Sequence, residues 1–130
     1  MKSRLKKAKY NEDFLAKFEE LLPNDYFDWK ITVVFYIAVH YIDAYFLSHG
    51  TSINSHESRR YTMEHHHSAL SEDCVDNYDN LYRLARNARY NGFLGLKEWT
   101  KHQRDCLKEA KKNLSVIRKE ITDDLDQIAD

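Results

Sequence analysis

The chain has 130 residues, with 20 basic and 21 acidic side chains and a formal net charge of −1. This length fits a single domain with one core, and the balanced charge excludes an overall basic field, so any binding to nucleic acid would need a local patch. Three Gly and one Pro leave few places to turn, which favours long helices over a sheet. We predict that residues 1–130 form one all-α domain, an up-and-down bundle of four long helices plus one short helix.

The cellular compartment is predicted from the cysteines and from the apolar segments. Cys74 and Cys106 lie far apart and have no CxxC partner, so reduced thiols are expected rather than disulfides or a cysteine zinc site. The basic start lacks an apolar stretch of signal-peptide length, and no run of eighteen or more uncharged apolar residues occurs. We therefore expect a cytoplasmic protein that is not associated with a membrane.

The first two helices are predicted from their apolar patterns. From about Ser3 to Leu22 apolar residues recur every three or four positions between charges, and Pro23 stops this amphipathic helix. The segment from Tyr26 to Gly50 is apolar almost all the way round and rich in β-branched and aromatic residues, which also suits a strand. Its length favours one buried helix. A helix that is apolar on every side needs neighbours on every side, so we expect it at the centre of the fold or in a dimer interface.

Three further helices complete the prediction. After a loop, Ser55 or Asn54 is placed to cap a short helix through RRYTMEHHH, and Ser71 begins a helix that stops at Asn91-Gly92. From about Leu96 onward apolar residues keep near-heptad spacing over a long final helix. The apolar stripes of the last two helices are Val75, Tyr78, Leu81, Tyr82, Ala85 and Ala88, then Leu107, Ala110, Leu114, Ile117, Ile121 and Ile128. Short connections make sequential helices antiparallel.

Three motifs in this order resemble the HEPN-domain superfamily of small helical bundles. They are FYIAVHYIDAYFLSHG, SINSHESRR and YDNLYRLARNARY, and the resemblance covers about residues 26–125. The matching positions are Phe35, Tyr36, Ala38, His40, Ala44, Leu47, Gly50, Ser55, His56, Arg86, Ala88 and Tyr90.

The resemblance implies a homodimer packed through the middle helices and one of two roles. Some HEPN proteins resemble metal-independent ribonucleases, with an Arg and a His separated by four to six residues. Others lack that pair and act as partners of nucleotidyltransferases or as nucleotide-binding modules. In this chain Asn91, not a histidine, stands five residues after Arg86 in the late helix. The resemblance therefore implies binding more than catalysis.

An alternative catalytic pair is Arg60 and His65, which have four residues between them. In such a pair His would transfer a proton and Arg would stabilise charge on a phosphorane as RNA is cut by its own 2′-hydroxyl. Five positions on one helix differ by about 140° in direction, so these side chains diverge. Arg59 with His66, or Arg60 with His67, would fit a six-residue gap equally well. Polar surface is the simpler interpretation of the whole segment.

A metal site is not predicted in the triple histidine. Adjacent helical residues point about 100° apart and cannot hold one ion together. Glu64 and His67 could supply two ligands, but no third is evident. We therefore predict neither a metal nor a cofactor.

A second candidate site would bind a phosphate or a nucleotide. His40 and Asp43 are polar groups on a helix that should be buried, and such groups need partners, either each other or residues of the late helix. A structural network that fixes the packing is one interpretation. The functional one is a phosphate- or nucleotide-binding pocket, in which Arg donates forked hydrogen bonds and Tyr stacks. Its residues are His40, His56, Arg86, Arg89 and Tyr90.

Three functions follow from these observations. The first is an accessory module that binds nucleotide or RNA, paired with a nucleotidyltransferase in a toxin–antitoxin or defence system. The second is a metal-independent endoribonuclease that uses Arg60 and His65. The third is a structural interaction bundle without a ligand. A basic cluster near the start could add RNA phosphate contacts to the first function, although charged termini are often only solvated; it comprises Lys2, Arg4, Lys6, Lys7 and Lys9.

Overall fold

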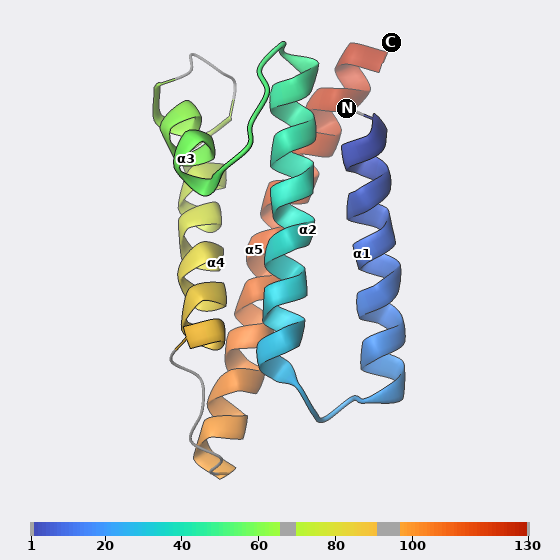
Figure 1. The fold of residues 1–130 in the computed structure, drawn as a ribbon, viewed down its shortest axis with the longest axis vertical. Coiled ribbons are helices and arrows are strands. Elements are labelled where there is room, and N and C mark those ends of the chain that lie inside the picture. The colour runs from blue at the N-terminus through green and yellow to red at the C-terminus, as the bar shows by residue number, and fades with distance from the viewer. Residues whose placement is uncertain (1, 66–69, 91–96, 130) are drawn as a thin grey trace.

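The computed structural model describes residues 2–65, 70–90 and 97–129, and it is helical with no strand in these ranges. The five helices are α1 (Lys2–Leu21), α2 (Phe27–Ser48), α3 (His56–His65), α4 (Glu72–Tyr90) and α5 (Lys97–Ala129). Figure 1 shows α1, α2, α4 and α5 running alternately down and up, with the short α3 beside the upper end of α4. The predicted all-α bundle of four long helices and one short helix is confirmed.

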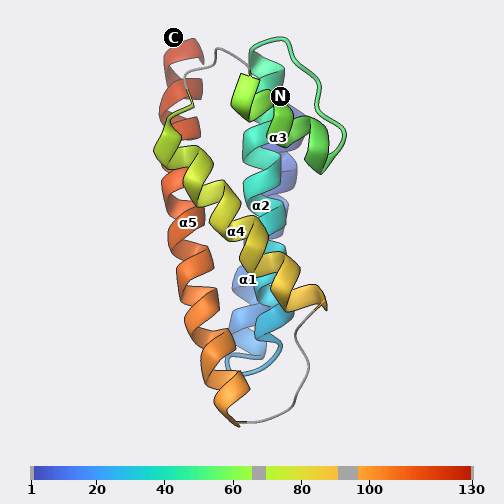
Figure 2. The same cartoon turned by 90° about the vertical axis from the view of Figure 1, so that its left-hand side faces the viewer.

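The centre of the bundle is α2, which packs against α1, α4 and α5, while α4 and α5 also pack against each other. Figure 2 shows α4 crossing α2 obliquely, with its first turns beside α5. By length and composition α2 could also span a membrane, but 72% of its most apolar window is buried within the bundle. Burial of this kind is typical of the core helix of a globular protein. The fully buried core includes Ile37, Ile42, Tyr45, Phe46, Tyr78, Leu81, Ala85, Ala110, Ile117 and Ile121.

Local capping explains where α3 and α4 begin. Ser55 accepts a hydrogen bond on its Oγ from the backbone N–H of Ser58 at 3.0 Å, and Ser71 does the same for Cys74 at 3.1 Å. Each serine thereby satisfies a donor that the first helical turn leaves unpaired. Ser71 is further held by Glu120 of α5, which accepts hydrogen bonds from its N–H at 2.8 Å and its hydroxyl at 2.5 Å. The predicted caps are confirmed, and the second one also ties α4 to α5.

The end of α2 is closed by a Schellman motif. Gly50 has φ of +81° and donates its N–H to the carbonyl of Leu47, while Thr51 donates to that of Phe46 at 2.8 Å. These two bonds satisfy carbonyls that have no partner further along the helix. Only glycine adopts this backbone region without strain.

The first turn of α2 carries a buried lysine that contacts the connection from α1. Lys30 is 1% exposed, and its Nζ donates to the carbonyl of Leu22 at 2.5 Å. The ammonium also lies over the rings of Phe18, at 5.4 Å, and Phe27, at 5.0 Å. Burial lowers the pKa of Lys30, and the charge of Glu19 partly opposes this shift. The lysine therefore fixes the turn after α1 through contacts that compensate for its lost hydration.

The first helix covers less of its apolar stripe than its sequence predicts. Ala8 and Leu15 are buried, but Phe14 is 50% exposed and Leu21 is 77% exposed. The reason is that α1 packs mainly on α2 and leaves one flank open. Apolar side chains on that flank remain in contact with water.

Candidate functional site

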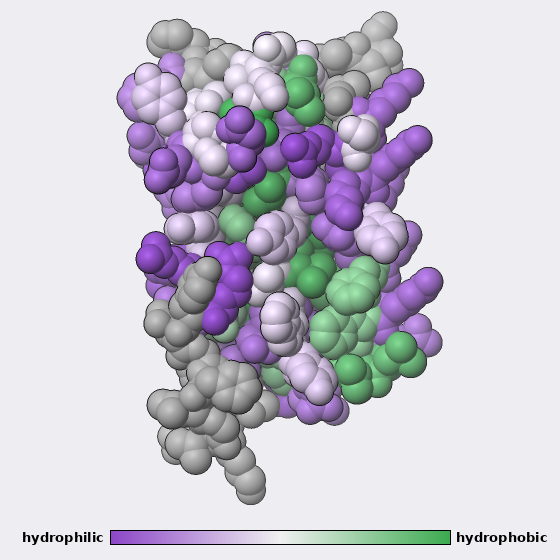
Figure 3. All heavy atoms as spheres, viewed as in Figure 1, coloured by the Kyte–Doolittle hydropathy of each residue, from purple (hydrophilic) through white to green (hydrophobic). Residues whose placement is uncertain are grey.

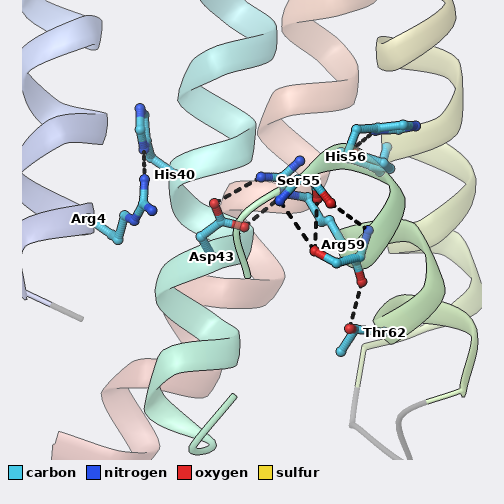
Figure 4. A network of polar contacts seen from close by, with 9 residues as sticks. Arg4, His40, Asp43, Ser55, His56, Arg59 and Thr62 are labelled. Atoms are coloured by element: carbon cyan, nitrogen blue, oxygen red, sulfur yellow. Dashed lines mark hydrogen bonds and ion pairs between the residues drawn. The ribbon is translucent and has the colours of Figure 1, made fainter. Parts of the chain in front are cut away.

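The most buried polar contact in the described residues joins α3 to α2. Arg59 donates from Nε to Oδ1 of Asp43 at 2.8 Å and from its terminal Nη2 to Oδ2 at 3.0 Å. Burial alone would lower the pKa of Arg59, but the hydrogen bonds and the charge of Asp43 outweigh it and raise the pKa. Figure 4 shows this pair between the two helices. Asp43 was expected to find a partner, and that partner is Arg59 rather than His40 or the late helix.

His40 lies on a different side of α2 from the Asp43–Arg59 ion pair and faces α1. Nη1 of Arg4 donates to its Nδ1 at 3.4 Å, and Figure 4 shows the two side chains apart from Asp43, Arg59 and His56. Partial burial, and then the positive charge of Arg4, lower the pKa of His40. The imidazole is therefore neutral near pH 7. The structure does not bring His40 together with His56.

His56 belongs to an aromatic stack between α3 and α4. Its ring lies 3.8 Å from the ring of Tyr82 with only 8° between the planes, and its Nδ1 lies 2.7 Å from the hydroxyl of Tyr78. Burial and the charge of Arg59 lower the pKa of His56, and burial raises the pKa of Tyr78 to about 12. A neutral imidazole with one nitrogen bound to a neutral phenol is available to accept or donate one further hydrogen bond.

Arg60 and His65 do not converge. Arg60 donates to both carboxylate oxygens of Asp79 on α4, at 2.6 and 2.8 Å, and pairs with Glu64 at 3.0 Å. The ring of His65 instead stacks on Tyr61 at 4.2 Å, and its Nδ1 lies 3.0 Å from the Tyr61 carbonyl. The guanidinium is thus neutralised by two carboxylates, and the imidazole interacts with its own helix. This geometry is that of a polar helix surface rather than a catalytic pair.

The remaining histidines of the triplet, His66 and His67, lie outside the described residues. The alternative pairs, Arg59 with His66 and Arg60 with His67, each include one of these histidines, so they too lie outside the described residues. Among the residues that are described, no group of three His, Cys, Asp or Glu side chains could hold a metal ion.

The arginines of α4 are arranged differently from those of α3. The guanidinium of Arg89 lies 5.8 Å from the centre of the Phe35 ring, and Phe35 in turn contacts Tyr82 at 5.7 Å. Arg86 is exposed, and it forms no ion pair within the described part of the chain. Tyr90 ends α4, but its side chain, like Asn91, lies outside what the structure describes. The stack of His56 and Tyr82 and the arginines Arg86 and Arg89 therefore share one side of α4, since positions 82, 86 and 89 are helical neighbours.

Comparison with known proteins gives no independent identification. No protein-family model matches the chain, and no curated protein matches it significantly.

Two contacts of the site are not among those predicted from the sequence. The pairing of Arg59 with Asp43 could have been considered, because a carboxylate in an apolar helix requires a cation or several donors. The stacking of Tyr82 on His56 has no sequence signal of its own, since it depends on how α3 lies against α4.

Proposed function

We propose that this chain is an accessory module, resembling HEPN proteins, which binds a nucleotide or RNA without cutting it. The observation that carries the proposal is the exposed side chain of Arg86, which has no carboxylate partner in the described residues and stands one helical turn after Tyr82, the ring that stacks on His56. Arginine donates forked hydrogen bonds to phosphate, and aromatic rings stack on bases. The α4 face defined by Tyr82, Arg86 and Arg89 suits a ligand that has both groups.

Binding without cleavage is favoured because each candidate catalytic site lacks a group that cleavage requires. Arg60 is neutralised by Asp79 and Glu64, so its charge is less available to a phosphorane. Where active HEPN proteins have a late-helix histidine, this chain has Asn91. An amide does not exchange protons near neutral pH, so it cannot serve as a general base.

The partners of the proposed module come from the resemblance alone. They are a second copy of the chain, packed through the middle helices, and a nucleotidyltransferase in a toxin–antitoxin or defence system in the cytoplasm. Within one chain α2 already has three neighbouring helices, so its burial does not require a second copy. Sedimentation velocity of the purified chain tests the homodimer directly.

The proposed function is tested by fluorescence anisotropy with labelled nucleotides and a short single-stranded RNA. Arg86→Ala should weaken binding by about fivefold to tenfold, the effect of losing one charge-assisted phosphate contact. Lys119→Ala is the matched control, because it removes one exposed positive charge from α5. Equal affinities of the two variants would reject the α4 face. No binding by the wild type would favour a purely structural bundle.

A further inference from the structure

The open flank between α1 and α2 forms a hollow lined by aromatic rings. Its volume is about 390 Å³, which lies within the range of roughly 300–1,000 Å³ common for ligand sites. The lining combines three aromatic rings with one valine and three polar side chains: Lys7, Tyr10, Asn11, Phe14, Val33, Tyr36 and His40. A second hollow of about 320 Å³, lined by Ser3, Lys6, Lys7 and Tyr10, shares two of these residues and continues along α1.

The rings in this hollow are more exposed than core aromatics. Tyr10 is 67% exposed, Phe14 50% and Tyr36 45%. Figure 3 shows green and pale side chains gathered over α2 and the facing part of α1 on this side of the molecule. Contiguous exposed apolar surface with a polar rim is typical of interaction sites and ligand-binding grooves.

The charge around the hollow indicates what kind of ligand it takes. Residues 2–9 contain five cations and no carboxylate, and the first acidic residue of α1 is Glu12. Glu12 is directed elsewhere, since it accepts a hydrogen bond from the hydroxyl of Tyr41 at 2.7 Å and lies 3.5 Å from Arg118. Lys7 itself lies over the ring of Tyr10 at 5.0 Å. A positive helix beside exposed rings is complementary to a chain of phosphates with unstacked bases.

From these observations we propose that the hollow between α1 and α2 binds single-stranded nucleic acid, with bases stacked on Tyr10, Phe14 and Tyr36 and phosphates on the lysines of α1. The site shares no residue with the α4 face, so it goes beyond the proposed function and does not depend on it. A mononucleotide would satisfy the α4 face, whereas the hollow and its extension along α1 require an oligonucleotide. His40 lines the hollow, and its pKa is lowered by burial and by Arg4, so a neutral imidazole can hydrogen-bond a base edge there.

The test measures the affinity of a fluorescein-labelled twelve-nucleotide RNA for exposed-ring variants. Tyr10→Leu and Tyr36→Leu should each weaken binding by about tenfold, because stacking contributes roughly 1–3 kcal/mol per base. Tyr61→Leu is the control, since Tyr61 on α3 is 64% exposed and lies outside the hollow. Lys7→Gln should reduce the slope of log affinity against log salt by about 0.7, and Lys17→Gln, lower on α1, should not. Circular dichroism of every variant checks that the helices remain.

Several outcomes overturn the inference. Equal affinities of the Tyr10, Tyr36 and Tyr61 variants would exclude stacking in the hollow. Duplex RNA of the same length binding as tightly as the single strand would exclude unstacked bases. Binding to vesicles of phosphatidylcholine and phosphatidylserine, but not to RNA, that is weakened by Tyr10→Leu would assign the hollow to a membrane surface. If the chain forms a dimer that Tyr36→Leu dissociates, and the wild type does not bind RNA, the hollow would instead be the contact with a second copy.

The two proposals fail separately. If Arg86→Ala leaves both nucleotide and RNA affinity unchanged while Tyr10→Leu lowers RNA affinity, the α4 face is rejected and the hollow stands. If mononucleotide binding is lost in Arg86→Ala and no oligonucleotide effect is seen at Tyr10 or Tyr36, the hollow is rejected and the α4 face stands. Repeating the titration with DNA of the same sequence then shows whether the hollow distinguishes the two sugars.

Discussion

Arg59 and Asp43 form a bidentate ion pair in which both side chains are almost fully buried, with exposed fractions of 7% and 2%. Removing one partner leaves a buried charge without compensation, which costs about 3–5 kcal/mol. We expect Asp43→Leu to lower the free energy of unfolding by this amount in urea titrations. The double variant Asp43→Leu/Arg59→Met should recover most of the loss, because it leaves no buried charge. A double variant as unstable as the single one would contradict this account.

The stability of the protein should depend on pH through His56. Its pKa is lowered from 6.5 in the folded state by burial and by Arg59, so the unfolded chain takes up a proton first as the pH falls. The free energy of unfolding should therefore decrease below about pH 6.5 and level off below the folded-state pKa. His56→Gln should flatten this slope in thermal melts between about pH 7 and pH 5. His65→Gln, on the exposed side of α3, is the control, and an identical slope in both variants would be evidence against the role of His56.

Ribonuclease activity is not expected from the Arg60 and His65 pair. Because Arg60 is held by Asp79 and His65 stacks on Tyr61, a mixed single-stranded RNA pool should remain intact with the wild type in EDTA. Gel electrophoresis of the pool checks this. Cleavage that disappears in both Arg60→Ala and His65→Ala would instead make this segment an active site.

The cap of α4 should contribute measurably to stability. Ser71→Ala removes the hydrogen bond to the N–H of Cys74 and the hydroxyl contact with Glu120, and loss of a helix cap costs about 0.5–2 kcal/mol. Chemical denaturation should show this decrease. Ser52→Ala, in the exposed loop before α3, should leave the midpoint unchanged, and equal effects at both serines would rule out the cap as the cause.

The glycine that ends α2 should tolerate substitution poorly. Gly50 has φ of +81°, and a side chain there would meet no neighbouring atom within 4 Å, so any loss comes from the backbone alone. Gly50→Ala should cost about 1–2 kcal/mol in unfolding free energy. Gly50→Asn should cost less, since asparagine enters this backbone region more readily. A larger loss in the asparagine variant would point to side-chain crowding instead.

Much of the fold is predictable from local patterns, whereas the site is not. Apolar periodicity, Pro23 and the serine caps determine where helices begin and end, and the predicted stripe of α5 is buried from Leu107 to Ile121. Side-chain pairing depends on the rotation of one helix against another. Arg59 and Arg60 are adjacent in sequence, yet they bind carboxylates on two different helices, Asp43 on α2 and Asp79 on α4. Spacing along one helix carries no information about that choice.

The same reasoning applies to the exposed rings of α1 and α2. Phe14 belongs to an apolar stripe that predicts burial, and only the packing of α1 mainly against α2 shows that it stays open. A hollow between helices arises from their relative placement, so a single-sequence pattern cannot distinguish its lining from core.

The central position of α2 also affects how the protein can be made in a cell. Its neighbour α5 begins 49 residues after α2 ends, at Lys97 against Ser48. At a synthesis rate of about 5–20 residues per second, α2, the most apolar helix, therefore remains without α5 for several seconds, with α1 and, late in that interval, α4 available to cover it. During that interval a newly made chain offers a long apolar helix to chaperones and to other nascent chains. We expect the yield of folded protein to depend on translation speed between residues 49 and 96 more than elsewhere in the sequence.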